Sequence, residues 1–391
     1  MDIITLSNNY NLYKEKLLRK RRFKYTDFCQ VINKHLDKEN INFSEPEFSF
    51  EGRKIFVMTY GTGETKILIF SQMHGNEPVS TEALMDFLNF LETDKNWSKK
   101  VTLIIIPLLN PDGNEKFDRR NAQGIDINRD ATTLISPEAR ILMKIHERFS
   151  PDFALNLHDM EPHYTSKPEN LQTVLAVLAP ECDEKGSLNT ARKRAVKVIS
   201  GIITAVKPLI PNRLAKYTDK FTPEAFGDTF MQKGTASILL ETGSIFNDKE
   251  RIFARKIVFL SIVKAVDLIA LKGYLHSPIG TYLKLPDNEK NNAFDLKIEK
   301  LSVKSNRGDY QLDIGIRRVK KTLNDEDFAD EFSDYRIVNI GDLRRFGAIK
   351  SFDGSDYVFS GEYSEIFIGQ KAAFEISSTK KNDIINIKSL L

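Results

Sequence analysis

Between residues 66 and 272, short apolar runs alternate with stretches whose apolar residues recur at helical spacing, and this alternation restricts the fold more than any other feature. A short apolar run bounded by turn signals is typical of a buried strand, whereas a period of about 3.6 residues is typical of an amphipathic helix. Strands are expected at 66–71, 101–107, 153–157, 173–178 and 236–240, and helices at 78–93, 136–149, 186–207 and 248–272. The alternation predicts an α/β domain with a mixed, mostly parallel sheet flanked by helices.

The two ends of the chain follow other patterns. Residues 1–45 are expected to form an N-terminal helical lead-in, whose apolar face comprises Phe28, Val31, Ile32 and Leu36. Two strands, at 48–60 and 66–71, are then expected to form a hairpin around Gly61-Thr-Gly63. After about residue 275 the pattern changes to short alternating runs at 295–303, 310–316, 335–340 and 364–369. Residues 276–391 are therefore predicted to be a β-rich accessory domain that follows a main domain at 46–275.

The composition is that of an ordinary globular protein, with 41% hydrophobic and 28% charged residues. A net charge of +3 gives no indication of a nucleic-acid partner. We interpret the basic cluster at 14–24 as a solvated helix end rather than a nucleic-acid or lipid patch. Two cysteines far apart fit a reducing compartment. Since the first twenty residues lack a signal-peptide core and no long apolar stretch exists, a cytoplasmic protein without membrane contact is expected.

Candidate metal ligands lie at the ends of two predicted strands. His74 and Glu77 follow the strand at 66–71, on the loop that leads into the next helix. An imidazole and a carboxylate that converge on one point suit Zn²⁺, which takes nitrogen and oxygen ligands. His158 closes the strand that starts at residue 153, and active sites of open α/β sheets gather at the carboxyl ends of strands. A single histidine at a strand end is usually structural, but beside His74 and Glu77 it predicts a third ligand.

Three protein ligands leave one position for water, which is typical of a catalytic zinc site and requires a general base. Glu241 ends the apolar run at 236–240, where partial burial would raise the pKa of its carboxyl towards neutrality. The competing interpretation is a glutamate that caps a helix or forms a salt bridge. The polar run 110–130 adds arginines, which can stabilise an oxyanion or hold a carboxylate in bidentate fashion. Asp126 in this run could orient a zinc-bound imidazole.

These residues together resemble a known family. The residues that carry the resemblance are His74-x-x-Glu77, Asn110-Pro-Asp-Gly113, Arg119, Asp126-x-Asn128-Arg129, His158 and Glu241. In this order and at these intervals they are similar to the zinc metallocarboxypeptidases of the carboxypeptidase A-like superfamily. The resemblance covers roughly residues 48–272. It implies a catalytic domain at 46–275 that binds one Zn²⁺ per chain through His74, Glu77 and His158.

The resemblance also implies roles for the other polar residues. Glu241 would be the general base, and Arg119 would polarise the scissile carbonyl. Asn128 and Arg129 would hold the terminal carboxylate of the substrate, and Asp126 would accept a hydrogen bond from His74.

Two further positions stay open between alternatives. Tyr217, or else Tyr164, would be the tyrosine that covers the bound chain end in this family. Asp228 either faces the specificity pocket or forms an Asx-turn, and His163 is more simply a surface residue than a substrate contact.

The function implied by the resemblance is hydrolysis of the C-terminal amide bond of a peptide or peptide-like substrate with a free carboxylate. One alternative is an inactive binding module that kept the fold. Another is an amidase or deacylase that acts on N-acyl amino acids or peptidoglycan fragments. Self-association through the β domain is a further hypothesis.

Overall fold

The computed structural model of the protein describes two compact units. The residues outside the description are 1, 19–21, 37, 39–40, 94–95, 218–219, 246–247, 249, 307, 320–333 and 361–365. Unit 1 comprises Met1–Pro162 and Thr173–Asn288, and unit 2 comprises His163–Gln172 and Glu289–Leu391. Residues 276–288 therefore belong to unit 1, and a segment of ten residues from the middle of the chain belongs to unit 2.

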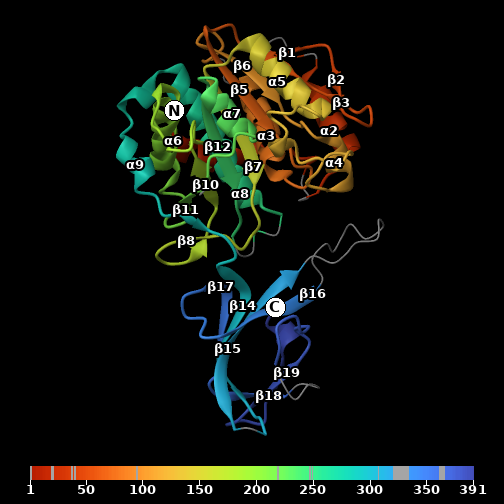
Figure 1. Cartoon of the computed structure of the whole chain (residues 1–391), viewed down its shortest axis with the longest axis vertical. Helices are drawn as coiled ribbons and strands as arrows, with labels where there is room; N and C mark the ends of the chain where they lie inside the picture. The colour runs from red at the N-terminus through yellow and green to blue at the C-terminus, as the bar shows by residue number, and fades with distance from the viewer. Residues whose placement is uncertain are drawn as a thin grey trace. The chain divides into compact units, whose positions relative to one another are not determined.

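Unit 1 is built on one large sheet (Figure 1). Within the described residues it has eight strands in the order β1-β4-β6-β5-β7-β12-β10-β11. Their bounds are β1 Ile41–Phe43, β4 Met58–Tyr60, β5 Thr65–Ser71, β6 Val101–Ile106, β7 Phe153–Asp159, β10 Leu175–Leu178, β11 Leu214–Lys216 and β12 Ala236–Thr242. Strands β6, β5, β7 and β12 run parallel, while β1, β4 and β10 each pair antiparallel with a neighbour. The predicted mixed, mostly parallel sheet is confirmed.

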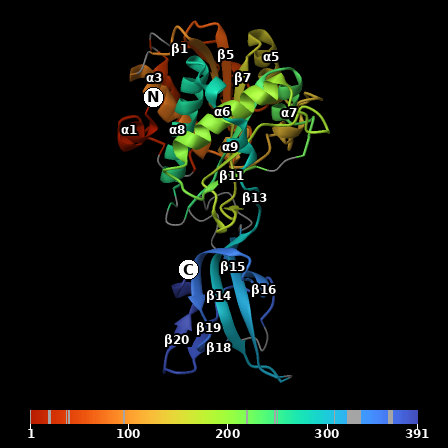
Figure 2. The ribbon, with the colours of Figure 1, turned by 90° about the vertical axis from the view of Figure 1, so that its left-hand side faces the viewer.

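Helices cover both faces of this sheet, as Figures 1 and 2 show. One face carries the larger core, which includes apolar side chains of α3 (Val79–Thr93), α6 (Thr190–Val206) and α8 (Ile252–Ala270). The other face packs against α5 (Pro137–Phe149) and α7 (Phe226–Gln232). The remaining helices of unit 1 are α1 Ile3–Asn8, η1 Tyr10–Leu12, α2 Tyr25–Ile32, η2 Asn33–His35, α4 Pro111–Lys116, η3 Ile127–Arg129, η4 Gly273–His276 and α9 Ile279–Leu283. Among the described residues, no helix combines the length and apolarity needed to span a bilayer.

The alternation of side chains along each strand decides which residues reach which face. In β5, Ile67 and Ile69 join the core under α3, α6 and α8, while Leu68 and Phe70 join the core under α5 and α7. In β12, Ile238 and Leu240 face the larger core, so the next residue, Glu241, faces the side of α5 and α7.

Three local predictions were wrong. β4 and β5 do not form a hairpin, because β6 lies between them in the sheet. Leu36 does not belong to the buried face of the lead-in, since the residue is 43% exposed. The described part of the strand expected at 364–369 forms a turn at residues 368–369, and residues 364 and 365 lie outside the described part of the chain.

A buried ionic cluster holds the N-terminal segment on α3 and α8. The guanidinium of Arg255 is fully buried and contacts Asp86 at 2.5 Å and Glu82 at 2.8 Å. The Tyr10 hydroxyl donates to Asp86, and the guanidinium also donates to the Leu18 carbonyl. Buried charges are tolerated when they are paired and hydrogen-bonded, and here the partners come from three distant segments.

Unit 2 is all β apart from one short 3-10 turn, η5 (Ile387–Ser389), within the residues that the structure describes. A seven-stranded sheet has the order β16-β15-β14-β18-β19-β20, with β17 paired to β14, and a smaller sheet has the order β13-β8-β9. The bounds are β8 Thr165–Ser166, β9 Leu171–Gln172, β13 Asn288–Glu289, β14 Ala293–Val303, β15 Tyr310–Val319, β16 Asp334–Gly341, β17 Gly347–Asp353, β18 Tyr357–Ser360, β19 Glu375–Ser378 and β20 Ile384–Asn386. Unit 1 also has a two-stranded ribbon of β2 (Glu47–Phe48) and β3 (Lys54–Ile55). The predicted all-β region towards the C-terminus is confirmed.

Candidate metal centre

Three parallel strands bring the predicted site residues to one edge of the sheet. The loop after β5 carries His74 and Glu77, β7 carries His158 near its end, and β12 carries Glu241. In the register of β7 and β12, His158 pairs with Glu241. Side chains at paired positions of parallel strands project from the same face, so the imidazole and the carboxylate lie beside each other.

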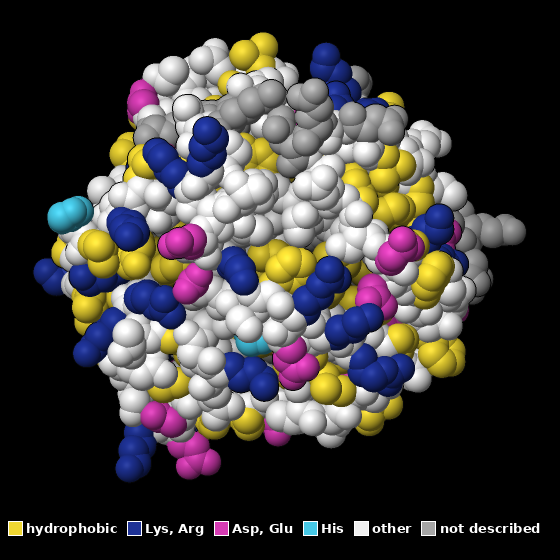
Figure 3. Space-filling view, turned by 90° about the horizontal axis from the view of Figure 1, so that it is seen from above, with side chains coloured by type: hydrophobic (Ala, Val, Ile, Leu, Met, Phe, Trp, Pro, Cys, Tyr) yellow, Lys and Arg dark blue, Asp and Glu magenta, His cyan; other side chains and the backbone are white. Residues whose placement is uncertain are grey.

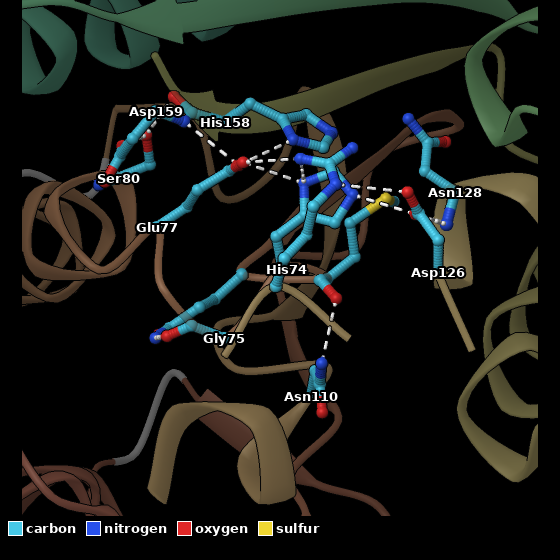
Figure 4. Close-up of polar contacts among 12 residues, drawn as sticks. His74, Gly75, Glu77, Ser80, Asn110, Asp126, Asn128, His158 and Asp159 are labelled. Atoms are coloured by element: carbon cyan, nitrogen blue, oxygen red, sulfur yellow. Dashed lines mark hydrogen bonds and ion pairs between the residues drawn. The ribbon is translucent and has the colours of Figure 1, made fainter. Parts of the chain in front are cut away.

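The loop after β5 is held by close backbone packing on the turn at 110–113. A Cβ atom on Gly75 would lie 1.9 Å from the carbonyl carbon of Gly113, so only glycine fits there. The Asn110 amide donates to the Met73 carbonyl at 3.1 Å, and the Gln72 amide donates to the Gly75 carbonyl at 2.9 Å (Figure 4). This packing explains why the two motifs, far apart in sequence, form one structure.

His74, Glu77 and His158 form the cluster that fits a metal ion. One ligand atom from each of these buried residues lies within 4.8 Å of the others. Nδ1 of His74 is 2.8 Å from Oε1 of Glu77, and Nδ1 of His158 is 2.8 Å from Oε2 (Figure 4). Two imidazoles and one carboxylate are the ligand set of many catalytic zinc sites, so the residues present fit the predicted Zn²⁺.

Hydrogen bonds fix how the two imidazoles face Glu77. Nε2 of His74 is 3.0 Å from Oδ1 of Asp126, a carboxylate that can only accept, so Nε2 carries the proton and Nδ1 presents a lone pair. A lone pair at 2.8 Å from a carboxylate oxygen is repulsive unless a proton or a metal cation lies between them. Nδ1 of His158 also faces the site, since it lies 2.8 Å from Oε2 of Glu77, while its Nε2 is buried with no hydrogen-bond partner among the described residues.

The charge states of Glu77 and His158 suit a cation, whereas at His74 a proton competes with the cation. Burial alone would raise the pKa of the Glu77 carboxyl, but the imidazoles of His74 and His158 outweigh burial and hold that pKa well below its usual range. Burial lowers the pKa of His158, although Glu77 opposes it, which favours the neutral imidazole that binds metals. For His74, burial is outweighed by Glu77 and Asp126, so its pKa is raised.

Arg119 reaches the same cluster from the polar run. Its Nε donates to Asp126 at 3.1 Å, and its Nη1 lies 3.2 Å from Oε1 of Glu77. Burial would lower the pKa of this guanidinium, but Glu77 and Asp126 outweigh it and raise the pKa, and Glu241 adds to the same effect. The side chain is 44% exposed, so it borders the site rather than its interior.

The other predicted residues have the following positions. Asn128 and Arg129 lie in η3, where the Asn128 amide oxygen accepts from the Phe226 backbone N–H at 3.1 Å. Asp228 is buried in α7 and accepts from the Thr222 backbone N–H. Tyr217 follows β11, and its N–H donates to the Val177 carbonyl of β10.

Two predicted residues belong to unit 2. Tyr164 lies in the segment His163–Gln172, and His163 is 3.2 Å from Asp295 of the same unit.

Asp159 and Ser80 were not singled out from the sequence. The Asp159 carboxylate accepts hydrogen bonds from the backbone N–H groups of Val79 and Ser80, at the start of α3. The sequence holds one signal, since Pro78 precedes α3 and has no side-chain acceptor that could cap it. Nothing in the sequence indicates that the cap comes from residue 159.

Comparison with known proteins agrees with this geometry. The model of the zinc carboxypeptidase family matches residues 44–158, which contain the three candidate ligands and end before Glu241. Probable carboxypeptidase 2 of Arthroderma benhamiae is 29% identical over 142 residues, which cover 32% of this chain and 27% of that protein. Human carboxypeptidase D is 34% identical over 98 residues, or 21% of this chain and 7% of that protein. The matched part thus spans about a quarter or less of these curated relatives.

Solved structures extend the likeness of the fold beyond the matched segment. A metallo-carboxypeptidase from Burkholderia cenocepacia aligns with a TM-score of 0.50 and 19% identity, covering 65% of this chain and 70% of that one. Carboxypeptidase A from Helicoverpa armigera aligns with a TM-score of 0.51 and 15% identity, covering 68% of this chain and 81% of that one. At these identities the likeness concerns the fold.

Proposed function

We propose that this chain, whose residues 44–158 match the zinc carboxypeptidase family, hydrolyses the C-terminal amide bond of a peptide or peptide-like substrate. The observation that carries the proposal is the convergence of His74, Glu77 and His158 at a strand edge where Glu241 is the paired neighbour of His158. Zinc held by the three ligands would supply the Lewis acidity that polarises a carbonyl and makes water more acidic.

Glu241 is the proposed general base. The residue is 8% exposed and stands near the end of β12, beside His158. From there it would take a proton from the attacking water and deliver it to the leaving amine. Arg119 is the proposed electrophile, because a partly exposed guanidinium that borders Glu77 can reach a developing oxyanion.

Asn128 and Arg129 are the proposed carboxylate clamp. Because the Asn128 amide oxygen already accepts from Phe226, its NH₂ group is the part left to donate to a substrate. Arg129 follows on the same short turn, and its guanidinium contributes to lowering the pKa of Asp126, so it lies within electrostatic reach of the site. A clamp of this kind would select substrates that end in a free carboxylate.

Tyr217, with Tyr164 as the alternative, remains the proposed cover for the bound chain end. Asp228 remains a proposed pocket residue, although its bond to Thr222 already uses one carboxylate oxygen.

The proposed partner is a peptide rather than a nucleic acid. The face seen in Figure 3 carries Lys and Arg side chains interspersed with Asp, Glu and hydrophobic ones, and the side chains described in that view show no uniform basic field. Both cysteines are free thiols, which supports the proposed cytoplasmic location. Self-association through unit 2 stays a hypothesis.

The test is a pair of peptides that differ only in a free or amidated C-terminus. The zinc-loaded protein should release the last residue from the free-ended peptide, lose this activity when a chelator removes zinc, and regain it with added zinc. Equal turnover of the amidated peptide would contradict the clamp. Turnover of N-acyl amino acids or peptidoglycan fragments alone would favour an amidase, and no turnover with zinc bound would favour a binding module.

A further inference from the structure

The residues directly after His158 and Glu241 point to the opposite face of the sheet and meet there. Asp159 pairs with Thr242 in the register of β7 and β12, one step beyond the pair formed by His158 and Glu241. Because side chains alternate along a strand, the two site residues project towards α5 and α7, and their two successors project towards α3. The start of α3, which follows Glu77, lies between these successors.

Ser80 connects them. Its hydroxyl is fully buried and lies 2.7 Å from Oδ1 of Asp159, 2.8 Å from Oγ1 of Thr242 and 2.8 Å from the backbone carbonyl oxygen of His158. A hydroxyl has one proton to donate, and a charge-assisted bond to a carboxylate is the stronger choice. Ser80 therefore donates to Asp159 and accepts from Thr242, which gives a chain of bonds from β12 through α3 to β7.

Asp159 adds two further connections, both close to the metal ligands. Its carboxylate accepts from the N–H groups of Val79 and Ser80 at 2.7 and 3.0 Å, and so caps α3 two residues after Glu77. Its own backbone N–H lies 3.2 Å from Oε2 of Glu77 (Figure 4). One residue thus holds the helix start with its side chain and the ligand carboxylate with its backbone.

A buried cation accompanies this carboxylate. Burial raises the pKa of Asp159, and the positive charge of Arg251 opposes that rise. Arg251 is 4% exposed at the start of α8. Burial lowers the pKa of Arg251, and Asp159 opposes this more strongly than any other carboxylate near it. Asp159 and Arg251 are therefore both buried. Hydrogen bonds to charged groups resist rearrangement in such an environment.

We propose that Asp159, Ser80 and Thr242 form a positioning junction, which fixes the metal ligand Glu77 and the proposed base Glu241 relative to each other across the sheet. The part that concerns Glu241 rests on the proposed function. The part that concerns Glu77 requires only that the site binds zinc. The three are positioning residues, since they act through Glu77 and Glu241 rather than on the substrate.

The test compares the wild-type chain with Thr242→Val, which removes one hydroxyl and keeps the shape. We expect zinc affinity within about twofold of wild type, an unchanged KM and a kcat lowered roughly tenfold, the effect typical of losing a group that orients catalytic residues. Thr242→Ser keeps the hydroxyl and should retain the wild-type kcat. An unchanged kcat in Thr242→Val would overturn the link to Glu241.

Thr235→Val is the matched control. Thr235 precedes β12 at its other end, and its buried hydroxyl also makes two hydrogen bonds, to His146 and to the Pro151 carbonyl. Its loss should lower the melting temperature about as much as Thr242→Val does, without the fall in kcat. If both variants lose kcat equally, the effect is general destabilisation and the positioning role is wrong.

Asp159→Asn tests the hold on Glu77, with zinc affinity measured by competition with a chelating indicator. We expect about tenfold weaker binding, because both carboxylate oxygens of Asp159 accept hydrogen bonds at the start of α3 and an amide has only one acceptor oxygen. Ser80→Ala gives the same reading if Asp159→Asn does not fold, with a smaller loss expected. Unchanged zinc affinity in the folded variant would overturn the proposed role of Asp159 in positioning Glu77. A wild-type chain that binds zinc but cleaves no peptide would refute the proposed function, and the measured zinc affinities would still test the role of Asp159.

Discussion

At the scale of single residues, neighbouring positions on one strand have opposite tasks. His158 and Glu241 face the proposed site, while Asp159 and Thr242 face α3 on the other side of the sheet. This division follows from strand geometry, which sends successive side chains to opposite faces. A substitution of His158 or Glu241 is therefore expected to change the site directly, whereas a substitution of Asp159 or Thr242 is expected to act through the packing of α3.

Glu241→Gln should separate metal binding from catalysis. The amide keeps the size of the side chain but cannot take a proton, so we expect zinc content to be retained and kcat to fall by about two to four orders of magnitude. His158→Ala should instead reduce zinc content. Metal analysis together with steady-state kinetics checks both, and a Gln variant that has lost its zinc would mean that Glu241 is a ligand.

Arg129→Ala should act mainly on KM. A clamp on the terminal carboxylate is used in the ground state and the transition state alike, so its removal weakens binding without changing the chemical step. We expect KM to rise about tenfold to a hundredfold with a kcat near that of wild type, corresponding to the loss of a charge-assisted bond. Arg120→Ala is the control, because Arg120 is an exposed arginine of the same polar run whose Nη1 donates to the Gly124 carbonyl. A pure loss of kcat in Arg129→Ala would contradict the clamp.

At the scale of helices and strands, the sequence predicts single elements, because local patterns determine them. Apolar runs identify β5, β7 and β12. Because His74, Glu77 and His158 lie at or just past strand ends, the candidate metal site follows from pattern and position together. The order of strands is not local. The supposed hairpin of β4 and β5 is split by β6, a contact between segments about forty residues apart that no turn signal reveals. The cap that Asp159 places on α3 is also a contact between distant segments, so local sequence patterns do not predict it.

The packing of α5 against α7 and β12 carries a pH dependence. His146 of α5 stacks on Phe230 of α7 with ring centroids 4.1 Å apart, and its Nε2 lies 2.8 Å from the Thr235 hydroxyl. Burial, with a smaller contribution from Lys233, lowers the pKa of His146 to about 4. An unfolded chain binds this proton near pH 6.5. Stability from the neutral imidazole is therefore complete above about pH 6.5 and is lost as the pH falls to about 4.

His146→Gln should remove this component. We expect the variant to be less stable than wild type at pH 7, since it loses the ring stacking, but to lose about 1–2 kcal/mol less between pH 6.5 and pH 4. Urea unfolding at a series of pH values measures the difference. Burial also lowers the pKa of His35, so the wild-type slope alone is not diagnostic, and identical slopes in the two chains would refute the assignment.

At the scale of the whole molecule, each unit is built from two separate segments of the chain. His163–Gln172 leaves unit 1 to supply β8 and β9 of the small sheet in unit 2, and Asn292 bonds to Thr165 and Asn170 of that segment. The change of pattern near residue 275 indicates where the β-rich region begins, but it does not reveal an insertion of ten residues. Contacts of this kind arise from tertiary packing, which overrides the local pattern.

Residues 276–288 give the last prediction, because they complete unit 1. Tyr282 of α9 is 3% exposed, and its hydroxyl accepts from the Ala179 backbone N–H at 3.2 Å. The Pro286 carbonyl accepts from the Lys216 N–H at 2.7 Å, at the edge strand β11. A chain that ends at residue 275 loses these contacts, whereas a chain that ends at residue 288 keeps them.

The shorter chain should therefore be less stable by about 3–5 kcal/mol, the cost of removing one large buried aromatic side chain. For a unit of this size, that corresponds to a melting temperature lower by roughly 6–20 °C. Both chains lack the main sheet of unit 2, so the loss of partners for residues 163–172 is common to them and cancels in the comparison. Calorimetry of the two chains side by side gives the answer. Equal melting temperatures would mean that α9 adds nothing to unit 1 and that the unit is complete without it.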